Sequence, residues 1–331
     1  MALTLSILDL APIAPGETAS ESFAASVALA QQAEKSGYAR VWYAEHHNMP
    51  SIASSATSVL IAHVASQTST IRLGAGGIML PNHSPLVIAE QFGTLDALHP
   101  GRIDLGLGRA PGGDHSTFRA LRRDPAASDR FPQDVVELQA YLAGRSRVPG
   151  VTATPGAGSH VPLYILGSSL FGAHLAATLG LPYAFASHFA PAALHDAVAT
   201  YRREFQPSDQ LAEPYVIAGV NAIASDDHDD ALEQLTQVKR ARVLMLLRQS
   251  GQVPLDRTFT DDELDMLLDS PVGAQVASMT HYTGVGTGAE VSEYISAFAE
   301  RTSADEVIVA HSSLSVPARL RSVELLATAH H

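Results

Sequence analysis

The 331-residue sequence contains no cysteine and has fewer basic than acidic residues. Without cysteine the chain forms no disulfides, and zinc–thiolate sites, iron–sulfur clusters and cysteine nucleophiles are excluded. The 21 Lys and Arg residues against 34 Asp and Glu residues give a formal net charge of -13. Because nucleic-acid phosphates bind basic surfaces, this balance argues against a nucleic-acid partner, although it leaves room for a local cationic pocket.

Long hydrophobic runs are also missing. No apolar run approaches the length of a membrane span, and residues 1–17 lack the basic leader and the apolar stretch of a secretory signal. We therefore expect a cytoplasmic protein that does not enter membranes. Hydrophobic residues still make up 46% of the chain and charged residues 17%, so the chain has enough apolar side chains to bury a large core.

Segments with the patterns of strands and of helices alternate along the whole chain. Strand–helix alternation with short connections implies parallel strands. The number of strands matches a (β/α)8 barrel, the α/β fold that is also called a TIM barrel. Strands are expected at residues 3–10, 40–44, 71–77, 102–108, 162–167, 182–186, 215–224 and 306–310.

A doubly wound open sheet is the alternative α/β architecture. Its first strand is usually followed by a glycine-rich fingerprint, whereas the first strand here runs into Leu10-Ala11-Pro12. No change in composition marks a domain boundary, so we expect one barrel domain over residues 1–331. Residues 250–287 have mixed signals, and we expect a mobile inserted loop there, before the last strand.

Glycines end two successive predicted strands. Gly76 and Gly77 end the third strand, and Gly106 and Gly108 alternate along the end of the fourth. In a parallel barrel these two strand ends are neighbours. Residues without side chains let a flat ring approach the backbone, or they relieve crowding between strands and form a bulge. The pattern leaves both explanations open.

Two groups of residues near these strand ends suit a phosphate. Arg109 follows the fourth strand directly and Arg130 lies in the next polar stretch, and a guanidinium fork fits phosphate oxygens. Gly167, Ser168 and Ser169 join the fifth strand to a helix N-terminus, where unpaired N–H groups and the helix dipole favour anions. Solvated arginines and a plain serine helix cap are the alternatives. Together with the glycines, these residues favour a flat cofactor that carries a phosphate.

The run Glu45-His46-His47-Asn48 follows the second strand and contains two adjacent histidines. One of them can face the barrel mouth while the other packs, which would provide a general acid or base or a hydrogen-bond donor. A metal site would need further ligands from other strands, and no typical metal-ligand spacing is present. A loop cap with a buried imidazole is the third interpretation. The additional histidines that could serve as metal ligands are His188, His281 and His311.

Several motifs taken together resemble the bacterial luciferase-like flavin monooxygenases. Their order and spacing hold over nearly the whole chain, and they are specific as a set although each is weak alone. The matching stretches are Trp42-Tyr43-Ala44-Glu45-His46-His47, residues 77–85 (GIMLPNHSP), Ala89-Glu90-Gln91, residues 101–109 (GRIDLGLGR) and Gly167-Ser168-Ser169.

This resemblance implies a (β/α)8 barrel that uses FMN in its reduced form as a cosubstrate, supplied by a separate flavin reductase. Oxygen would add at the flavin C4a position, and the resulting C4a-peroxyflavin would oxidise an aldehyde or another small organic substrate. The resemblance also implies that His46 is the catalytic imidazole near C4a. It places the flavin phosphate against Arg109, Arg130, Ser168 and Ser169.

The resemblance further implies which backbone faces the flavin and which residues face the substrate. Gly76–Gly77 corresponds to an unusual non-proline cis peptide bond under the flavin, and Gly108 and Gly167 are further expected cofactor contacts. The substrate pocket is expected to be shaped by the 250–287 segment as well. Its other predicted residues are Leu10, Glu45, His47, Asn48, His188 and Phe189.

Three other functions stay open at this point. An F420-dependent oxidoreductase on the same barrel would need more cationic residues for its longer anionic tail. A flavin-binding protein without turnover would not need the run at residues 45–47. A metal-dependent barrel hydrolase requires bound metal, and we expect none. The resemblance also implies a homodimer, formed through the Ala/Ser-rich helix expected at residues 54–67.

Overall fold

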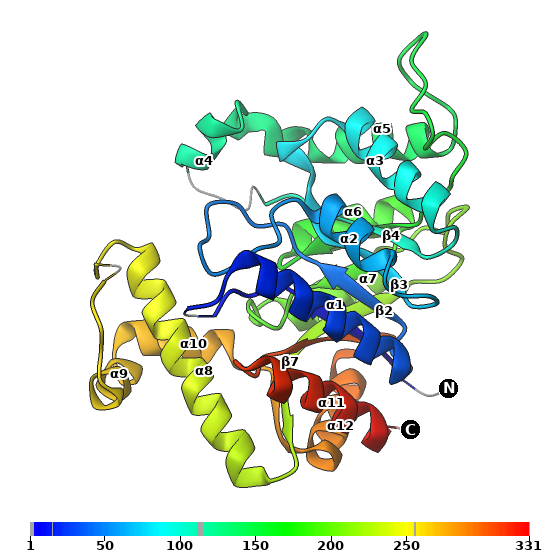
Figure 1. The fold of residues 1–331 in the computed structure, drawn as a ribbon. Coiled ribbons are helices and arrows are strands. Elements are labelled where there is room, and N and C mark those ends of the chain that lie inside the picture. Colours follow the sequence, from blue (N-terminus) through cyan, green and yellow to red (C-terminus); the bar gives the residue numbers. More distant parts are fainter. Residues whose placement is uncertain (1–2, 15, 111–114, 255, 331) are drawn as a thin grey trace.

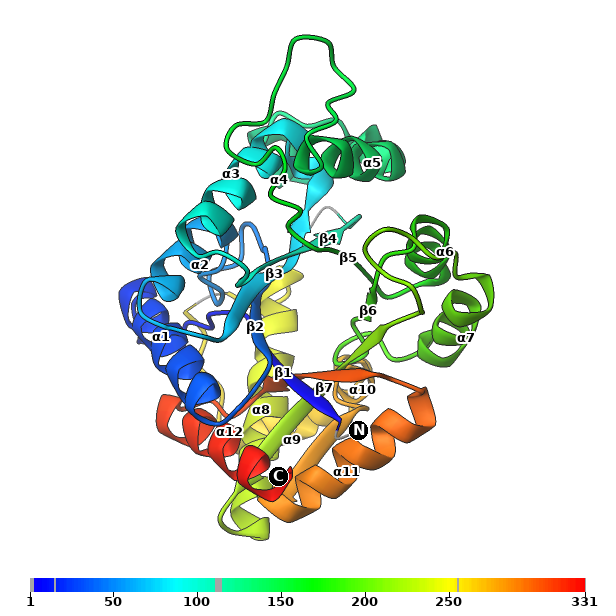
Figure 2. The same ribbon diagram turned by 90° about the vertical axis from the view of Figure 1, so that its right-hand side faces the viewer.

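The computed structural model describes residues 3–14, 16–110, 115–254 and 256–330. Eight parallel strands form a closed barrel in the order β1-β2-β3-β4-β5-β6-β7-β9, and β9 pairs back with β1. Figure 2 shows these strands as a ring with helices packed around its outside. The predicted (β/α)8 barrel is therefore confirmed.

Helices connect and cover the barrel strands. The barrel strands are β1 (Thr4–Asp9), β2 (Arg40–Tyr43), β3 (Arg72–Met79), β4 (Ile103–Gly108), β5 (Leu163–Gly167), β6 (Tyr183–Phe185), β7 (Val216–Ser225) and β9 (Glu306–His311). The longer helices are α1 (Ala19–Lys35), α2 (Thr57–Ala65), α3 (Pro85–Leu98), α5 (Phe131–Leu142), α6 (Leu170–Leu179), α7 (Leu194–Glu204), α8 (His228–Gln249), α11 (Gly288–Thr302) and α12 (Val316–His330). Three short helical segments are η1 (Leu80–Asn82), α4 (His115–Ala120) and η2 (Pro125–Arg130).

Local sequence sets the boundaries of these elements. Thr18 and Glu21 form a reciprocal capping box that starts α1. Gly180 ends α6 with a φ of 62°, a left-handed conformation that glycine adopts without a steric penalty. Every residue of β4 is buried, as expected for a parallel strand with helices on one face and the barrel interior on the other. None of the helices within the described ranges combines the length and apolar character needed to cross a membrane.

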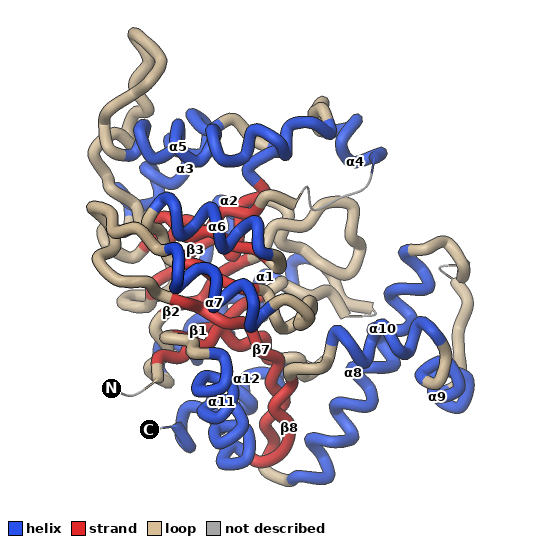
Figure 3. The backbone as a smooth tube through the Cα atoms, turned by 180° about the vertical axis from the view of Figure 1, so that it is seen from behind, coloured by secondary structure: helices blue, strands red, loops and turns tan. Residues whose placement is uncertain are grey.

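Residues 250–287 form the expected insertion before the last strand, but much of this segment is helical rather than a loop. They contain α9 (Asp261–Leu268), α10 (Pro271–Met279) and a ninth parallel strand, β8 (Thr283–Thr287), which pairs with residues 221–225 of β7. The helices were missed because both are short and bury little: α9 has no buried residue, and α10 buries only Gly273 and Val276. The capping box that begins at Thr260 was the available signal. Figure 3 shows α8, α9 and α10 projecting together beyond the strands.

The only tryptophan of the chain fills the centre of the barrel, and glycines make room for it. Trp42 of β2 packs edge-on against Tyr164 of β5, with ring centroids 4.9 Å apart. A Cβ added at Gly76 would lie 2.9 Å from the Cβ of Trp42, and one at Gly106 would lie 2.3 Å from the carbonyl oxygen of Ala75. Such distances are too short for real Cβ contacts. The packing of the barrel therefore requires these glycines, which supports the crowding explanation.

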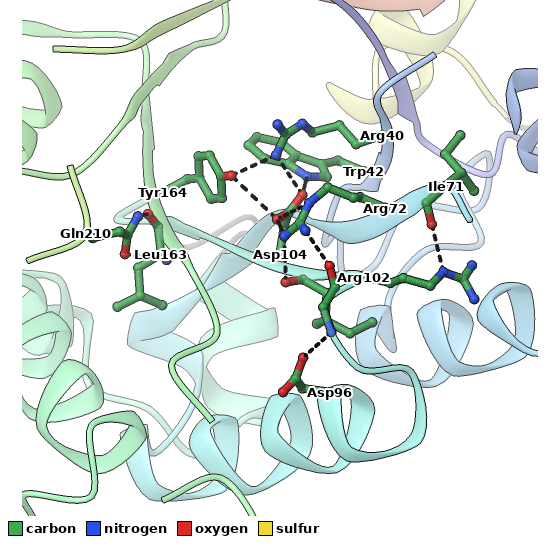
Figure 4. Close-up of polar contacts among 12 residues, drawn as sticks. Arg40, Trp42, Ile71, Arg72, Asp96, Arg102, Asp104, Leu163, Tyr164 and Gln210 are labelled. Atoms are coloured by element: carbon green, nitrogen blue, oxygen red, sulfur yellow. Dashed lines mark hydrogen bonds and ion pairs between the residues drawn. The ribbon is translucent and has the colours of Figure 1, made fainter. Parts of the chain in front are cut away.

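A buried ionic network closes the barrel at the end where its strands begin. Arg40 of β2 lies 2.8 Å from Asp104 of β4 and 3.0 Å from Glu306 of β9, and Arg72 of β3 forms a second ion pair with Asp104. Tyr164 accepts a hydrogen bond from Arg40 at 2.7 Å. Figure 4 shows Arg40, Arg72 and Tyr164 converging on Asp104. Because the two buried carboxylates face two arginines, their charges are balanced inside the barrel.

The carboxylates of Glu306 and Asp104 keep Arg40 positively charged. Burial alone would lower the pKa of Arg40, but the attraction of Glu306 and Asp104 outweighs burial and raises this pKa above its ordinary value. Arg40 therefore remains a cation at any pH at which the protein is folded. The network acts as a fixed polar layer beneath the apolar centre of the barrel.

Removal of Arg40 should destabilise the protein strongly. The Arg40→Met variant leaves two buried carboxylates short of a cation, which costs about 3–5 kcal/mol. Arg321→Met is the matched control, because Arg321 pairs with Asp226 and Glu324 on the surface, where ion pairs contribute about 0–1 kcal/mol. Urea unfolding of both variants measures the difference in the free energy of unfolding. Equal midpoints for the two variants would show that the network is not needed for stability.

Candidate active site

All the barrel strands end on one face, and the predicted site residues lie there. Figures 1 and 3 show both chain termini at one end of the molecule and α4 with α8, α9 and α10 at the opposite end. His46 follows β2, Arg109 follows β4, Ser168 follows β5 and His188 follows β6. The carboxyl ends of the strands are where barrels of this kind carry their functional groups.

Glu45 is a buried carboxylate that connects the ends of β2 and β3. Its side chain lies 2.8 Å from His47 Nε2 and 2.9 Å from His83 Nε2. It also accepts hydrogen bonds from the backbone N–H of Met79 at 3.1 Å and from Asn82 Nδ2 at 3.4 Å. Burial would raise the pKa of Glu45, but the hydrogen bonds from His47 and His83 outweigh it and lower this pKa to about 2. The ionised carboxylate thus holds the two strand ends together.

The two residues that follow His46 shape the same loop. The hydrogen bond to Glu45 raises the pKa of His47, which favours a positively charged imidazole beside the carboxylate. Asn48 is exposed and has a φ of 56°, a left-handed conformation that Asn tolerates better than most residues. The contact between Glu45 and His47 therefore fixes the conformation of this loop. Contact of these residues with a substrate stays a prediction.

His46 itself keeps an unused nitrogen. Its backbone N–H donates to the carbonyl of Ser54 at 3.0 Å, which fixes the loop. Its Nδ1 is buried and has no hydrogen-bond partner among the residues that the structure describes. Burial lowers the pKa of His46, with Glu45 opposing that shift, so the imidazole is neutral at neutral pH. An unpaired buried polar atom costs free energy, and a ligand that bonds to Nδ1 would recover it.

His188 lies over β7 at the same end of the barrel. A Cβ at Gly219 would be 2.5 Å from His188 Nδ1, and the carbonyl of His188 accepts a hydrogen bond from Asn221 Nδ2 at 2.6 Å. Burial lowers the pKa of His188 to about 3, and the charge of Arg242 and that of His46 when it is protonated add to this effect. The two imidazoles of His188 and His46 are therefore near enough to interact electrostatically across the barrel mouth.

Two apolar residues predicted for the pocket flank these histidines. Leu10 packs against the cluster that fills the barrel, and its carbonyl accepts a hydrogen bond from Ser54 Oγ at 3.0 Å. Phe189 is 47% exposed and lies edge-on to His188, with ring centroids 5.0 Å apart. Both residues lie at strand ends, as predicted, and their contact with a substrate stays a prediction.

The structure separates the histidines that were considered as metal ligands. His311 is buried between β9 and α12, where its Nδ1 lies 2.8 Å from Ser322 Oγ. His281 packs against Tyr282, with ring centroids 4.6 Å apart. Over the described ranges, no group of three or more His, Cys, Asp or Glu side chains could hold a metal ion.

Arg109, Ser168 and Ser169 form an exposed group that we call the anion corner. The Arg109 guanidinium carbon lies 4.0 Å from the ring centroid of Phe171, in the first turn of α6, so this contact joins the end of β4 to the helix N-terminus. Ser168 and Ser169 are exposed, and Ser169, the N-cap residue of α6, makes no capping hydrogen bond with its side chain. The hydroxyls and the first N–H groups of the helix thus remain available to a ligand.

Two further predicted cofactor contacts lie beside the anion corner. Arg130 is exposed and ends η2, and Ser128 of the same segment donates a hydrogen bond to the Arg109 carbonyl at 3.4 Å. The η2 segment therefore touches the backbone of Arg109. A Cβ at Gly167 would lie 3.6 Å from the Cα of Gly172, an ordinary contact, so crowding alone does not require glycine there.

The peptide bond between Gly76 and Gly77 is cis, as the resemblance implied. The pairing of β3 with β4 shifts at this point. A Cβ at Gly77 would lie 2.8 Å from the carbonyl oxygen of Gly106, and one at Gly108 would lie 3.1 Å from Met79 Sδ. Contact of a cofactor with these glycines stays a prediction.

Sequence reasoning missed three residues of this face. His83 lies within the GIMLPNHSP stretch, but only the structure shows that it shares Glu45 with His47. Asn221 and Arg242 are joined by a hydrogen bond of 3.0 Å between β7 and α8. Nothing in the sequence distinguishes Arg242 from other arginines of a long polar helix, so no signal for it was available.

Comparison with known proteins gives matches over nearly the whole chain. The profile of the luciferase-like monooxygenases matches residues 3–306. A luciferase-like monooxygenase of Escherichia coli K12 is 48% identical over 329 residues, which are 98% of this chain and 96% of the relative. The crystal structure of apo-MsnO8 is similar with a TM-score of 0.87 and 35% identity, covering 99% of this chain and 98% of that chain.

Other similar proteins differ in cofactor and substrate. N-acetyl-S-alkylcysteine monooxygenase of Bacillus subtilis is 43% identical over 196 residues, 56% of this chain and 57% of the relative. The oxygenating constituent of 3,6-diketocamphane monooxygenase, in complex with FMN, has 17% identity and a TM-score of 0.70, covering 99% of this chain and 97% of that chain. An F420-dependent secondary alcohol dehydrogenase has 15% identity and a TM-score of 0.71, covering 99% of both chains. The last two likenesses show the fold alone.

The family profile spans most of the chain, and the Escherichia coli relative is matched over nearly its whole length. These findings confirm the resemblance drawn from the motifs. They also confirm the expected enzyme class, a luciferase-like flavin-dependent monooxygenase. The chain with this barrel and this strand-end site belongs to the luciferase-like monooxygenase family.

Proposed function

We propose that this protein uses reduced FMN and O2 to oxidise an aldehyde or another small organic substrate, with reduced flavin supplied by a separate reductase. The observation that carries the proposal is the neutral imidazole of His46, whose buried Nδ1 has no partner in the described structure. It lies at the same end of the barrel as the anion corner. When bound, reduced flavin supplies activated oxygen, so that one oxygen atom enters the substrate and the other leaves as water.

The anion corner has the positive charge and the hydrogen-bond donors that the phosphate of FMN requires. Arg109 is held against Phe171 beside the N-terminus of α6. A guanidinium, two hydroxyls and helix N–H groups together make a strong set of donors for one phosphate. Many barrels bind phosphate after their seventh and eighth strands, whereas this set follows β4 and β5. Arg130, carried by the adjoining η2 segment, would add a second cation.

His46 is the residue proposed to act on the reacting atoms. A neutral imidazole donates a hydrogen bond from one ring nitrogen and accepts one at the other, so it can hold or move a proton without adding charge to the site. Glu45 is a positioning residue in this scheme. Its buried carboxylate fixes His47 and His83 and thereby the loop from which His46 projects.

FMN is proposed over F420 on the basis of charge. Relatives support a flavin-type cofactor, but an FMN complex and an F420-dependent enzyme share this fold alike. The anion corner suits one phosphate, and a net charge of -13 opposes the longer anionic tail of F420. The Bacillus subtilis relative is named for N-acetyl-S-alkylcysteines, so such thioethers are suitable first substrates to test besides aldehydes.

Removal of the Arg109 guanidinium should weaken FMN binding by about tenfold or more, because charge-assisted hydrogen bonds contribute about 1.5–3 kcal/mol. Titration of purified protein with FMN, followed by flavin fluorescence, measures the dissociation constant of wild type and Arg109→Ala. Arg301→Ala, an exposed arginine at the end of α11, is the control and should bind as wild type does. A parallel titration in which F420 binds and FMN does not would refute the cofactor assignment.

Replacement of His46 should impair turnover more than flavin binding. His46→Gln is expected to lower kcat by about 100-fold or more, the usual contribution of a positioned acid–base group, while FMN affinity stays near that of wild type. His195→Gln, on the exposed side of α7, is the control. Oxidation of a thioether or aldehyde panel with reduced FMN measures both variants. Wild-type turnover by His46→Gln would remove this residue from the chemistry.

The same assignment predicts the pH profile. Burial disfavours the protonated form, so the pKa of His46 lies below the ordinary imidazole value of about 6.5. The neutral form is therefore present across neutral and alkaline pH and is lost only as the pH falls below that value. We expect kcat to be constant above pH of about 7 and to decline on the acid side. An alkaline loss of activity with no acid limb would contradict a neutral His46.

We further propose a homodimer through α2. Its Val59 is 67% exposed, and Val87 on the neighbouring α3 is 43% exposed, while Ser58 and Gln91 join the two helices by a hydrogen bond of 3.1 Å. Exposed apolar side chains on adjacent helices favour association. Light scattering should give about twice the chain mass of 34.9 kDa. A monomer mass, or an unchanged dimer in Val59→Glu, would contradict this interface.

A further inference from the structure

Arg242 is a partly buried cation at the barrel mouth, beside β7 and separated from the anion corner by the end of β6. It projects from α8 towards the end of β7, where its Nη2 donates to Asn221 Oδ1 at 3.0 Å, and its Nη1 donates to the carbonyl of Met279 at 3.2 Å. Ser312, after β9, donates a second hydrogen bond to the same Asn221 oxygen at 3.2 Å. The contacts of Arg242 therefore fix its position but leave several N–H groups of the guanidinium unused.

Among the residues that the structure describes, no carboxylate compensates this charge. Both acceptors of Arg242 are neutral oxygens, and over the described ranges it forms no ion pair. Arg240, two residues earlier on α8, shows the contrast, because it pairs with both Asp261 and Asp265 at 2.6 Å. A desolvated cation without a counter-charge is costly. Binding of an anionic ligand would offset this free-energy cost, whereas binding of an apolar ligand would not.

Hydrogen bonds connect Arg242 to one of the histidines at the barrel mouth. Asn221 accepts from Arg242 Nη2 at 3.0 Å and donates to the His188 carbonyl at 2.6 Å, and His188 is near enough to His46 to interact electrostatically. His188 Nδ1 is buried and unpartnered in the described structure, and it adds a polar atom to the barrel mouth. The ring of His188 lies over Gly219 and packs edge-on against Phe189, an exposed apolar side chain.

We propose that Arg242 binds the carboxylate of the substrate, so that this enzyme oxidises small organic acids at a position some distance from their carboxylate. The proposal rests on the proposed monooxygenase function, which it narrows to one substrate class. A planar guanidinium with free N–H groups matches a carboxylate in two-point geometry. Asn221 holds the guanidinium and Ser312 holds Asn221, so both act as positioning residues.

Isothermal titration calorimetry on the full-length protein without flavin tests this proposal. The probes are N-acetyl-S-methylcysteine, its primary amide, butyrate and inorganic phosphate. We expect the acid to bind at least about tenfold more tightly than its amide. Arg242→Gln should weaken binding of the acid by about tenfold or more and leave the amide unchanged, and Arg242→Lys should restore part of the loss. Arg240→Gln is the matched control on the same helix and should bind both compounds as wild type does.

A purely structural Arg242 would weaken acid and amide equally when replaced, which would overturn the proposal. Equal binding of acid and amide by wild type, or no binding of either acid, would overturn it as well. Phosphate bound more tightly than both acids through Arg242 would exclude a carboxylate site. If Arg242→Gln does not fold, the affinities of wild type and of Arg242→Lys for the acid and for its amide still test the proposal. FMN titration of the same variants separates the two proposals, because acid binding by a protein that binds no FMN would refute only the cofactor assignment.

Discussion

The pairing of Arg40 with two buried carboxylates is the interaction on which the barrel depends. Asp104 and Glu306 lie on β4 and β9, two strands away from β2 in either direction around the ring, and Arg40 contacts both. A cation is tolerated inside an apolar barrel only where its charge is balanced. Because the strands are parallel and their register is fixed, this contact near their beginnings also determines where their opposite ends lie.

The two ends of the barrel differ in how their buried charges are paired. The pairing at one end stabilises the fold, whereas the other end has cations available for ligands. At the closed end, the carboxylates of Asp104 and Glu306 face arginines, so little charge remains for a ligand. At the open end, Glu45 is likewise saturated by hydrogen bonds and serves the loop geometry. Arg109 and Arg242 are different, because their contacts involve an aromatic ring and neutral oxygens rather than carboxylates.

The sequence was informative where burial leaves a pattern. The barrel strands are buried on both faces and read as short apolar runs, so all of them were predicted, and the glycine pair at residues 76–77 was located correctly through the family resemblance. The helices α9 and α10 are short and bury few residues, so their segment showed mixed signals and was taken for a loop. The proposed role of Arg242 could not be predicted, because it depends on the lack of a carboxylate partner in the described structure, which a sequence does not reveal. The sequence left two explanations for the glycines open, and only the structure shows that Trp42 occupies the space beside Gly76.

The order of strands around the ring limits how ligands can lie at the open end. His46 follows β2, the anion corner lies between the ends of β4 and β5, and Arg242 stands beside β7. These positions divide the ring into roughly equal parts, so neither cation lies next to the other. Because the end of β6 separates the two cations, we expect each to hold its own ligand, and two such ligands would meet over the mouth on the side of His46. The separation of the two uncompensated cations therefore favours a site built for a pair of ligands, as a reaction between a cofactor and a substrate requires.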